Sequence, residues 1–224
     1  MALEKQVNQI LSQFPRSRLN SKNGLFVKKF LNTWPENLNI LGGKKILTPE
    51  QRFQNEITKR KDMPEGVFSK LITQDPEKLI LYLENLEGNN LAEIYAKLGP
   101  GERNIYNREM FSILKEMHSY GIIDGDTQLR NFMFTPKENE RAIKKTDLEA
   151  EWSYKKEGKL LDLLQLSSDI YSKTNRIDRD ADQIVYAIED AYGPIQKMPV
   201  PKYMRTYFKV GWKIPEEFIQ FLEK

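Results

Sequence analysis

The amino-acid sequence predicts an α+β fold, because predicted strands are frequent in the first half of the chain and helical patterns dominate the second half. A break that contains glycine and asparagine, residues 87–90, separates the two parts. At 224 residues the chain is long enough to bury a substantial core, as one compact unit or as two small lobes. We expect a small N-terminal part, residues 1–87, and a mainly helical C-terminal part, residues 88–224, with a hinge near Gly88.

The first thirty residues predict a helix followed by a strand. Apolar side chains recur at helical spacing over residues 3–14, and Pro15 ends this pattern. The Asn23-Gly24 pair is a typical hairpin turn signal, and the run Leu-Phe-Val at residues 25–27 predicts a strand directly after it.

Another helix and two more strands are predicted before the break. Thr48 is a favourable N-cap and Pro49 suits a first helical turn, so a helix is expected over about residues 49–62. Residues 67–72 and 78–83 have the composition of strands, and a Gln-Asp-Pro-Glu sequence forms the turn between them.

Helices are the main prediction after the break. Helices are expected over residues 91–97 and 102–119, two short strands at 122–123 and 132–134, and mainly helix from about residue 159. The residues expected on the buried side of the second of these helices are Ile105, Met110, Ile113, Leu114 and Met117.

The most informative segment is a polar loop between the two short apolar runs. It places Asp126 and Asn131 five residues apart, and Asp147 follows sixteen residues beyond Asn131. Phosphoryl transfer requires a carboxylate that orients the attacking hydroxyl, and oxygen ligands that hold magnesium against the triphosphate. Two protein ligands are enough for magnesium, because this ion keeps several of its waters. These three residues therefore point to phosphotransferase chemistry.

The same segment resembles the catalytic core of the protein-kinase-like superfamily. The resemblance is carried by the stretch MHSYGIIDGD at residues 117–126, by Asn131 and by DLE at residues 147–149. These motifs are similar to those of the small atypical kinases, which include the kinase subunit of the KEOPS tRNA-modification complex, the RIO kinases and the lipopolysaccharide Kdo kinases. Aminoglycoside phosphotransferases share the pattern more distantly. The resemblance implies a two-lobed fold with a reduced N-terminal lobe, and ATP and magnesium (Mg2+) as cofactors. It also implies that Asp126 is catalytic and that Asn131 and Asp147 bind the metal.

Weaker matches extend the resemblance over roughly residues 19–172. Lys28 ends a strand-like run, as the nucleotide-binding lysine does, although Lys29 is a rival one residue away. Glu56 matches the helix glutamate that holds this lysine. Glu84 and Leu86 match the hinge, where their backbone groups would meet adenine.

Two further residues match structural supports of the family's catalytic loop. Asp162 resembles the helix aspartate that braces this loop, and His118 resembles a histidine that packs and hydrogen-bonds beside it. We expect both to support the site and not to carry the chemistry.

The sequence also departs from the family pattern. Asp124 stands where the resembled branch usually has histidine, and no Gly-x-Gly-x-x-Gly motif is present. Leu-Glu replaces the Phe-Gly of ordinary protein kinases after Asp147, as in several small-molecule kinases. Only fourteen residues separate Asp147 from Asp162, too few for a long peptide-docking activation segment.

Simpler interpretations of the same residues remain open at this stage. Asp126 and Asn131 are also good turn residues, and Lys28 is compatible with a solvated strand. The basic residues Arg141, Lys144 and Lys145 are predicted to form a solvated hairpin.

The predicted function is an atypical serine/threonine protein kinase or an ATPase of the KEOPS or RIO type. The alternatives are a small-molecule kinase with an aminoglycoside- or sugar-like acceptor, and a nucleotide-binding pseudokinase that serves as an interaction module. The expected partners are ATP, a protein or small-molecule hydroxyl acceptor and an activating protein that closes the site.

Composition excludes several other classes. There is no cysteine and one histidine, which excludes disulfides, thiolate metal sites and multi-histidine zinc sites. The net charge of +3 is scattered, so no direct nucleic-acid binding is expected. No apolar run reaches the length of about 20 residues that a membrane helix needs, so no membrane contact is expected. The absence of cysteine makes a cytoplasmic location the expectation.

Overall fold

A computed structural model of the chain describes residues 17–22, 25–31, 47–63, 65–135, 142–151, 157–174 and 178–193, with no side chains described for 17–22 and 178–182. The predicted helix over residues 3–14, the Asn23-Gly24 turn and Arg141 lie outside the described residues. Within them the fold is mixed α+β, as the sequence predicts, and the strands of its sheets pair antiparallel.

The first sheet has four antiparallel strands in the order β1-β2-β4-β3. Its strands are β1 (Ser17–Lys22), β2 (Leu25–Phe30), β3 (Leu71–Asp75) and β4 (Ile80–Glu84). Lys22 lies opposite Leu25, so β1 and β2 pair closely on either side of the predicted turn. Lys28 lies opposite Leu81 in the centre of the sheet.

Helix α2 (Pro49–Lys61) packs against this sheet and begins where the sequence predicts. The Thr48 hydroxyl accepts a hydrogen bond of 3.2 Å from the backbone N–H of Gln51, which completes an N-cap. The rings of Phe30 and Phe53 meet edge to face at 5.6 Å. They belong to a small core made up of Phe30, Phe53, Ile57, Leu81 and Leu83.

A second sheet connects the middle of the chain to the C-terminal helices. Its strands, in the order β5-β6-β7, are β5 (Asn89–Asn90), β6 (Phe132–Phe134) and β7 (Ile143–Lys145). Beyond β7, residues 67–69 form a short parallel bridge, in which the Lys145 N–H donates to the Val67 carbonyl at 2.9 Å. Strand β7 is therefore covered along both of its edges.

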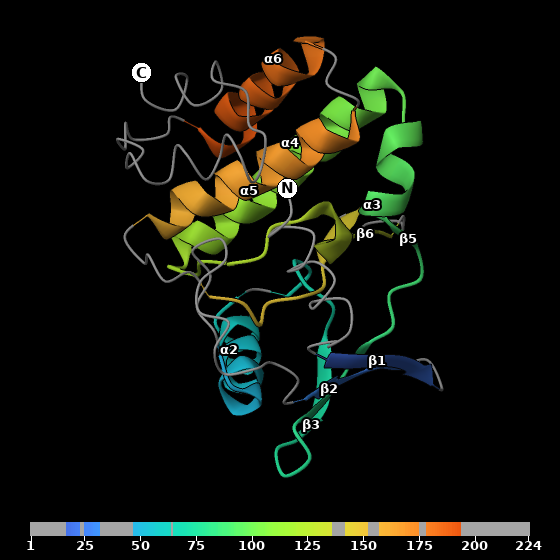
Figure 1. Cartoon of the computed structure of the whole chain (residues 1–224), viewed down its shortest axis with the longest axis vertical. Coiled ribbons are helices and arrows are strands. Elements are labelled where there is room, and N and C mark those ends of the chain that lie inside the picture. The colour runs from blue at the N-terminus through green and yellow to red at the C-terminus, as the bar shows by residue number, and fades with distance from the viewer. Residues whose placement is uncertain are drawn as a thin grey trace, which may run out of the picture.

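The helices surround a second, larger core. They are α3 (Leu91–Ile94) with a 3-10 turn (Tyr95–Lys97), α4 (Pro100–Ser119), α5 (Gly158–Lys173), α6 (Asp178–Ala187) and a π-helical turn (Ile188–Tyr192). Figure 1 shows α4 and α5 side by side next to α6, with the four-stranded sheet and α2 at the opposite end of the molecule. This core contains Phe111, Leu114, Leu161 and Leu164, and Val67 and Phe68 reach it from the N-terminal part.

The strands predicted at residues 67–72 and 78–83 are shifted along the chain to Leu71–Asp75 and Ile80–Glu84. Residues 67–69 instead bridge to β7 and contribute Val67 and Phe68 to the larger core. A strand-like composition indicates burial but does not identify the strand that will be the partner.

Two predictions around α4 are wrong. Residues 122–123 form no strand, because the N–H of Ile122 donates to the Met117 carbonyl at 2.9 Å. With Gly121 at a φ of +75°, this bond closes a Schellman motif at the end of α4. Ile105 is 62% exposed, whereas the other four residues predicted on the buried side of α4 are fully buried.

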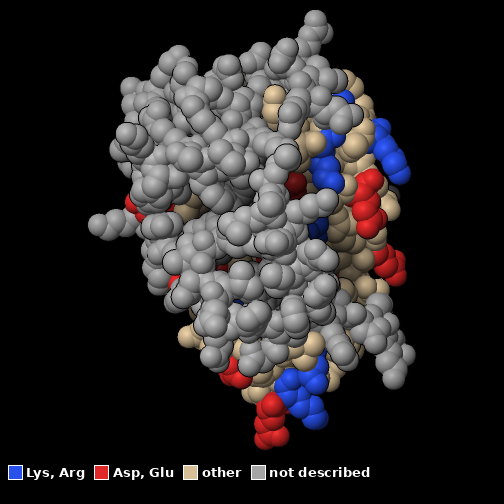
Figure 2. Space-filling view, viewed as in Figure 1, with Lys and Arg blue, Asp and Glu red and all other residues tan. Residues whose placement is uncertain are grey.

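Surface charges of both signs are interspersed on the described residues seen in Figure 2. None of the described helices combines the length and the apolar character that crossing a bilayer requires.

Candidate active site

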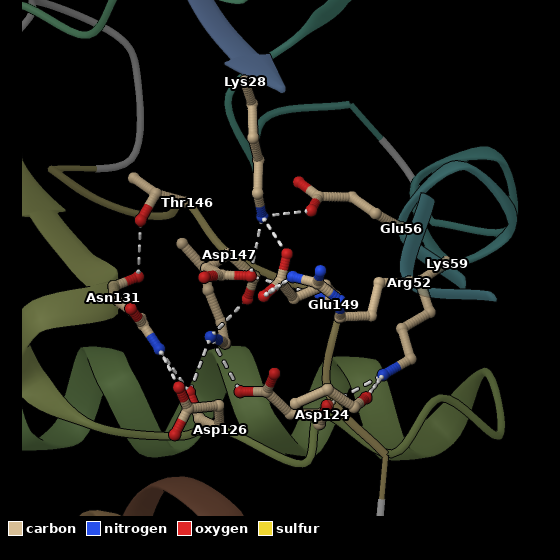
Figure 3. A network of polar contacts seen from close by, with 12 residues as sticks. Lys28, Arg52, Glu56, Lys59, Asp124, Asp126, Asn131, Thr146, Asp147 and Glu149 are labelled. Atoms are coloured by element: carbon tan, nitrogen blue, oxygen red, sulfur yellow. Dashed lines mark hydrogen bonds and ion pairs between the residues drawn. The ribbon is translucent and has the colours of Figure 1, made fainter. Parts of the chain in front are cut away.

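Lys28 lies among three carboxylates that come from two distant parts of the chain, helix α2 and the segment after β7 (Figure 3). Its ammonium is 2.5 Å from Glu56 Oε2 on α2, 3.0 Å from Asp147 Oδ1 and 3.1 Å from Glu149 Oε2. Lys28 is 2% exposed, whereas Lys29 lies on the other face of β2 and is exposed. The structure therefore places Lys28, not Lys29, against Glu56.

The spacing of α2 explains why Glu56 points inward. Arg52, Phe53, Glu56 and Ile57 recur at helical spacing and share the buried face of the helix. The apolar members pack in the small core, and the charged members consequently face the segment after β7. Arg52 contacts Glu149 there at 3.3 Å.

Glu56 also binds a second buried cation. Its Oε1 accepts hydrogen bonds from Arg60 Nη2 at 2.7 Å and from Arg60 Nε at 3.1 Å. Arg60 in turn donates to the Thr146 carbonyl at 2.6 Å and to the Ser69 carbonyl at 2.5 Å. Helix α2 is thereby joined to the residue directly before Asp147.

Burial and neighbouring charges together shift the pKa values of the groups at this site. Burial opposes the charge of Lys28, yet Asp147, Glu149 and Glu56 together raise the pKa of its ammonium well above the usual range. Desolvation opposes the ionisation of Asp147, but Lys28 lowers the pKa of this carboxyl to about 2. Burial raises the pKa of Glu149.

The carboxylates of Glu56, Asp147 and Glu149 each bring an oxygen within 4.8 Å of the others, a spacing that a metal ion also suits. Here the ammonium of Lys28 already contacts all three. We therefore interpret this group of three carboxylates as the binding partners of the Lys28 ammonium and not as the ligands of one metal ion.

A polar loop, residues 124–131, lies beside this group and is held by Asp162 of α5. The buried Asp162 carboxylate accepts hydrogen bonds from the N–H groups of Asp124 at 2.7 Å and Gly125 at 2.9 Å. It also lies 3.0 Å from His118 Nε2, which assigns the donor role to that nitrogen. The Tyr192 hydroxyl forms a hydrogen bond of 2.6 Å with His118 Nδ1 on the other side of the ring. Asp162 thus holds the loop directly, and His118 contacts the loop only through Asp162.

Asp126 and Asn131 meet within the loop. The Asn131 side-chain amide donates to Asp126 Oδ2 at 3.0 Å and to the Asp126 carbonyl at 2.8 Å. Gln165 Nε2 and Arg130 Nη2 each donate to the Asp126 carboxylate at 3.3 Å. Since the Asn131 nitrogen is engaged in this way, its amide oxygen is the atom left to face a ligand.

Magnesium, the metal implied by the resemblance, fits the donor chemistry of Asn131 and Asp147. Asp147 uses Oδ1 to accept hydrogen bonds from Lys28 and from the Glu149 N–H at 3.2 Å, and its side chain is 31% exposed. Its Oδ2 and the Asn131 amide oxygen are the two hard oxygens that would hold the ion.

Lys144 and Lys145 are buried, so the prediction that they form a solvated hairpin is wrong. The Lys145 ammonium lies 2.8 Å from Asp124 Oδ2 and donates to the carbonyls of Asp126 at 3.2 Å and Asp147 at 2.8 Å. Lys144 instead lies 3.7 Å from Glu84. The backbone of β7 is paired along both edges, so this segment is an inner strand and not the exposed hairpin that its basic side chains suggest.

Asp124 is fully buried beside Lys145. Burial raises the pKa of Asp124 to about 6, although Lys145 favours its charged form. Lys59 of α2 donates to the Asp124 carbonyl at 2.8 Å and to the Ala150 carbonyl at 2.6 Å. The loop and the segment after Asp147 are thus attached to the same helix.

Gly125 permits this close approach of the two segments. It has a φ of +85°, and a Cβ atom at this position would lie 2.8 Å from the backbone of Ala150 and Glu151. Any other residue would force the loop away from the chain that follows Asp147.

Glu84 and Leu86 lie at the end of β4 and just beyond it, on the side of the break. The N–H of Glu84 donates to the Lys70 carbonyl at 2.8 Å, and Leu86 is half-buried.

Every sequence-predicted site residue lies within the described part of the chain, and the structure adds Arg60, Lys59, Lys145 and Glu149 to the group around them. Glu149 was visible in the sequence only as a departure from a pattern. The three cations carried no sequence signal, since lysine and arginine are ordinarily exposed.

No known protein family matches the chain, and no curated protein has significant sequence similarity to it.

Proposed function

We propose that this protein is an ATP- and magnesium-dependent phosphotransferase with a two-lobed, protein-kinase-like arrangement. The main support is the meeting of a strand lysine, Lys28, with a helix glutamate, Glu56, at a position where Lys28 also reaches Asp147. We assign the small core around α2 to the proposed N-terminal lobe, residues 1–87, and most of the larger helical core to the proposed C-terminal lobe, residues 88–224; Met63, Val67 and Phe68 of the N-terminal part also contribute to the larger core.

Each proposed role follows from the charge and the position of a side chain. Lys28 binds the phosphates of ATP, and the pairing with Glu56 keeps it extended toward them. Asp147 and Asn131 hold magnesium, which neutralises charge on the β- and γ-phosphates when it is bound. The backbone groups near Glu84 and Leu86 contact adenine, because this segment follows the strand next to Lys28.

Asp126 orients the acceptor in this proposal. The acceptor hydroxyl oxygen attacks the γ-phosphorus while the bond from this phosphorus to the bridging oxygen breaks, so that ADP leaves. The hydroxyl proton passes to Asp126, whose carboxylate is held in place by Asn131 and Gln165.

The acceptor is a hydroxyl of a protein or of a small molecule. The short interval between Asp147 and Asp162 has no room for an extended peptide-docking segment, so the acceptor has to enter an open site. An open site without a glycine-rich covering loop admits water and lacks fixed donors around the phosphates. We therefore expect weak ATP binding and slow hydrolysis until a partner closes the site.

The test is calorimetric binding of ATP to the full chain with and without magnesium, followed by ATP turnover and radiolabel transfer to a panel of protein and small-molecule hydroxyl acceptors. Magnesium-dependent binding with turnover that Asp126→Asn abolishes is the expected result. Asp62→Asn, at the exposed end of α2, is the matched control. Binding without turnover would assign the chain to the pseudokinase class, and the absence of nucleotide binding would refute the proposal.

A further inference from the structure

The buried ammonium of Lys145 contacts three oxygens that come from two separate segments of the chain. It lies 2.8 Å from Asp124 Oδ2, and it donates to the carbonyls of Asp126 at 3.2 Å and Asp147 at 2.8 Å. Its side chain has no exposed surface, and the ring of Phe132 lies beneath it at 5.2 Å.

The two carbonyls belong to Asp126 and Asp147, which orient the acceptor and hold magnesium in the proposed reaction. Asp126 has to sit beside the acceptor hydroxyl, while Asp147 has to face the phosphates. One ammonium that binds the backbone of both residues sets the separation between them. A direct bond to the backbone restrains the position of each side chain without occupying its carboxylate.

Asp124 supplies the charge that such a lysine needs. An unpaired ammonium in the interior is strongly unfavourable, and a carboxylate at hydrogen-bond distance offsets much of that penalty. Asp124 is itself fixed, because its N–H donates to Asp162 and its carbonyl accepts from Lys59. This arrangement gives a physical reason for the carboxylate that stands where the resembled branch has histidine.

We propose that Lys145 is a positioning residue that fixes Asp126 relative to Asp147, and that Asp124 is its neutralising partner. This inference rests on the proposed phosphotransferase function.

A purely structural ion pair is the competing explanation, and it makes a different prediction. If Lys145 only balances the charge of Asp124, removing both charges together restores the activity. If Lys145 positions the two carbonyls, the double variant recovers stability but not the rate.

The experiment compares the parent with Lys145→Met, with the double variant Asp124→Asn, Lys145→Met, and with the control Lys144→Met. Lys144 is the preceding residue of the same strand and is also buried, but it faces Glu84. The measurements are the thermal unfolding midpoint, kcat and KM for magnesium-ATP with water as the acceptor, and deuterium exchange of the amides in residues 124–131 and 146–150.

We expect Lys145→Met to lower kcat on the order of 100-fold, the size of effect that a misplacement of about 1 Å produces, with a smaller change in KM. The double variant regains the unfolding midpoint of the parent, keeps the low kcat and exchanges faster in both segments. Lys144→Met keeps the parental kcat. A double variant with parental kcat, or with unchanged exchange in either segment, overturns the inference. If the parent itself neither binds nor turns over magnesium-ATP, the proposed function fails, and the exchange measurement alone decides whether Lys145 fixes the two segments.

Discussion

Replacing Glu56 by alanine removes the partner of two buried cations at once. The carboxylate is fully buried and binds Lys28 through one oxygen and Arg60 through the other. Removing one member of a buried ion pair typically costs about 3–5 kcal/mol, because the remaining charge stays in the interior without compensation. Here Lys28 keeps Asp147 and Glu149 as partners, and Arg60 keeps the carbonyls of Ser69 and Thr146. We therefore expect the lower limit of that range, about 3 kcal/mol of unfolding free energy.

Urea unfolding of the full chain, followed by circular dichroism, measures this loss. Gln54→Ala is the control, since Gln54 lies on the exposed face of the same helix and should change stability by no more than about 0.5 kcal/mol. Glu56→Gln keeps the shape and one acceptor, so its loss should fall between those of Glu56→Ala and Gln54→Ala. A loss below about 1 kcal/mol for Glu56→Ala would mean that Glu56 is not buried between two cations, and the geometry argued for the site would be wrong.

Three other results are expected. Asp126→Asn should abolish phosphoryl transfer and leave the calorimetric affinity for magnesium-ATP unchanged; turnover equal to that of the parent would contradict the role of Asp126. Lys28→Met should weaken ATP binding by about tenfold or more, which corresponds to the loss of one charge-assisted hydrogen bond. Lys29→Met should leave ATP binding unchanged. A larger loss of affinity for Lys29→Met than for Lys28→Met would show that the wrong lysine was assigned. Because burial raises the pKa of Asp124 from 3.8 to about 6, the folded state holds this proton more tightly than the unfolded state does. The protonated Asp124 therefore contributes about 3 kcal/mol to the free energy of unfolding. This contribution is fully present below about pH 4 and is lost as the pH rises through 6. Asp124→Asn cannot lose this contribution, so the free energy of unfolding of the variant minus that of the parent should rise between pH 4 and pH 7 in urea unfolding. A difference that does not change with pH would refute the raised pKa of Asp124.

Local signals in the sequence were sufficient for several elements of the fold. Thr48 and Pro49 located the start of α2, because capping and the fixed φ of proline depend on neighbouring residues only. The strand boundaries near residue 70 were wrong for the opposite reason. Residues 67–69 bridge to β7, which lies more than seventy residues further along the chain, and no local pattern specifies such a distant partner.

The same distinction applies to the site. The order and spacing of Lys28, Glu56, Asp126, Asn131 and Asp147 could be read from the sequence, because each belongs to a short motif or to one face of one element. The inward direction of Lys28 was a choice between two faces of a strand, and the register of β2 against β4 decided it.

Only the tertiary structure showed that Lys145 is an interior residue. In the sequence it belongs to a basic run that is typical of a solvated turn, and its position depends on two distant chain segments, β6 and residues 67–69, that pair with the two edges of β7. Its contacts are made to backbone carbonyls, which every residue carries and which therefore leave no mark on the sequence. The sequence by itself determined which chemical groups are available, and the fold determined which of them are buried together and so interact strongly.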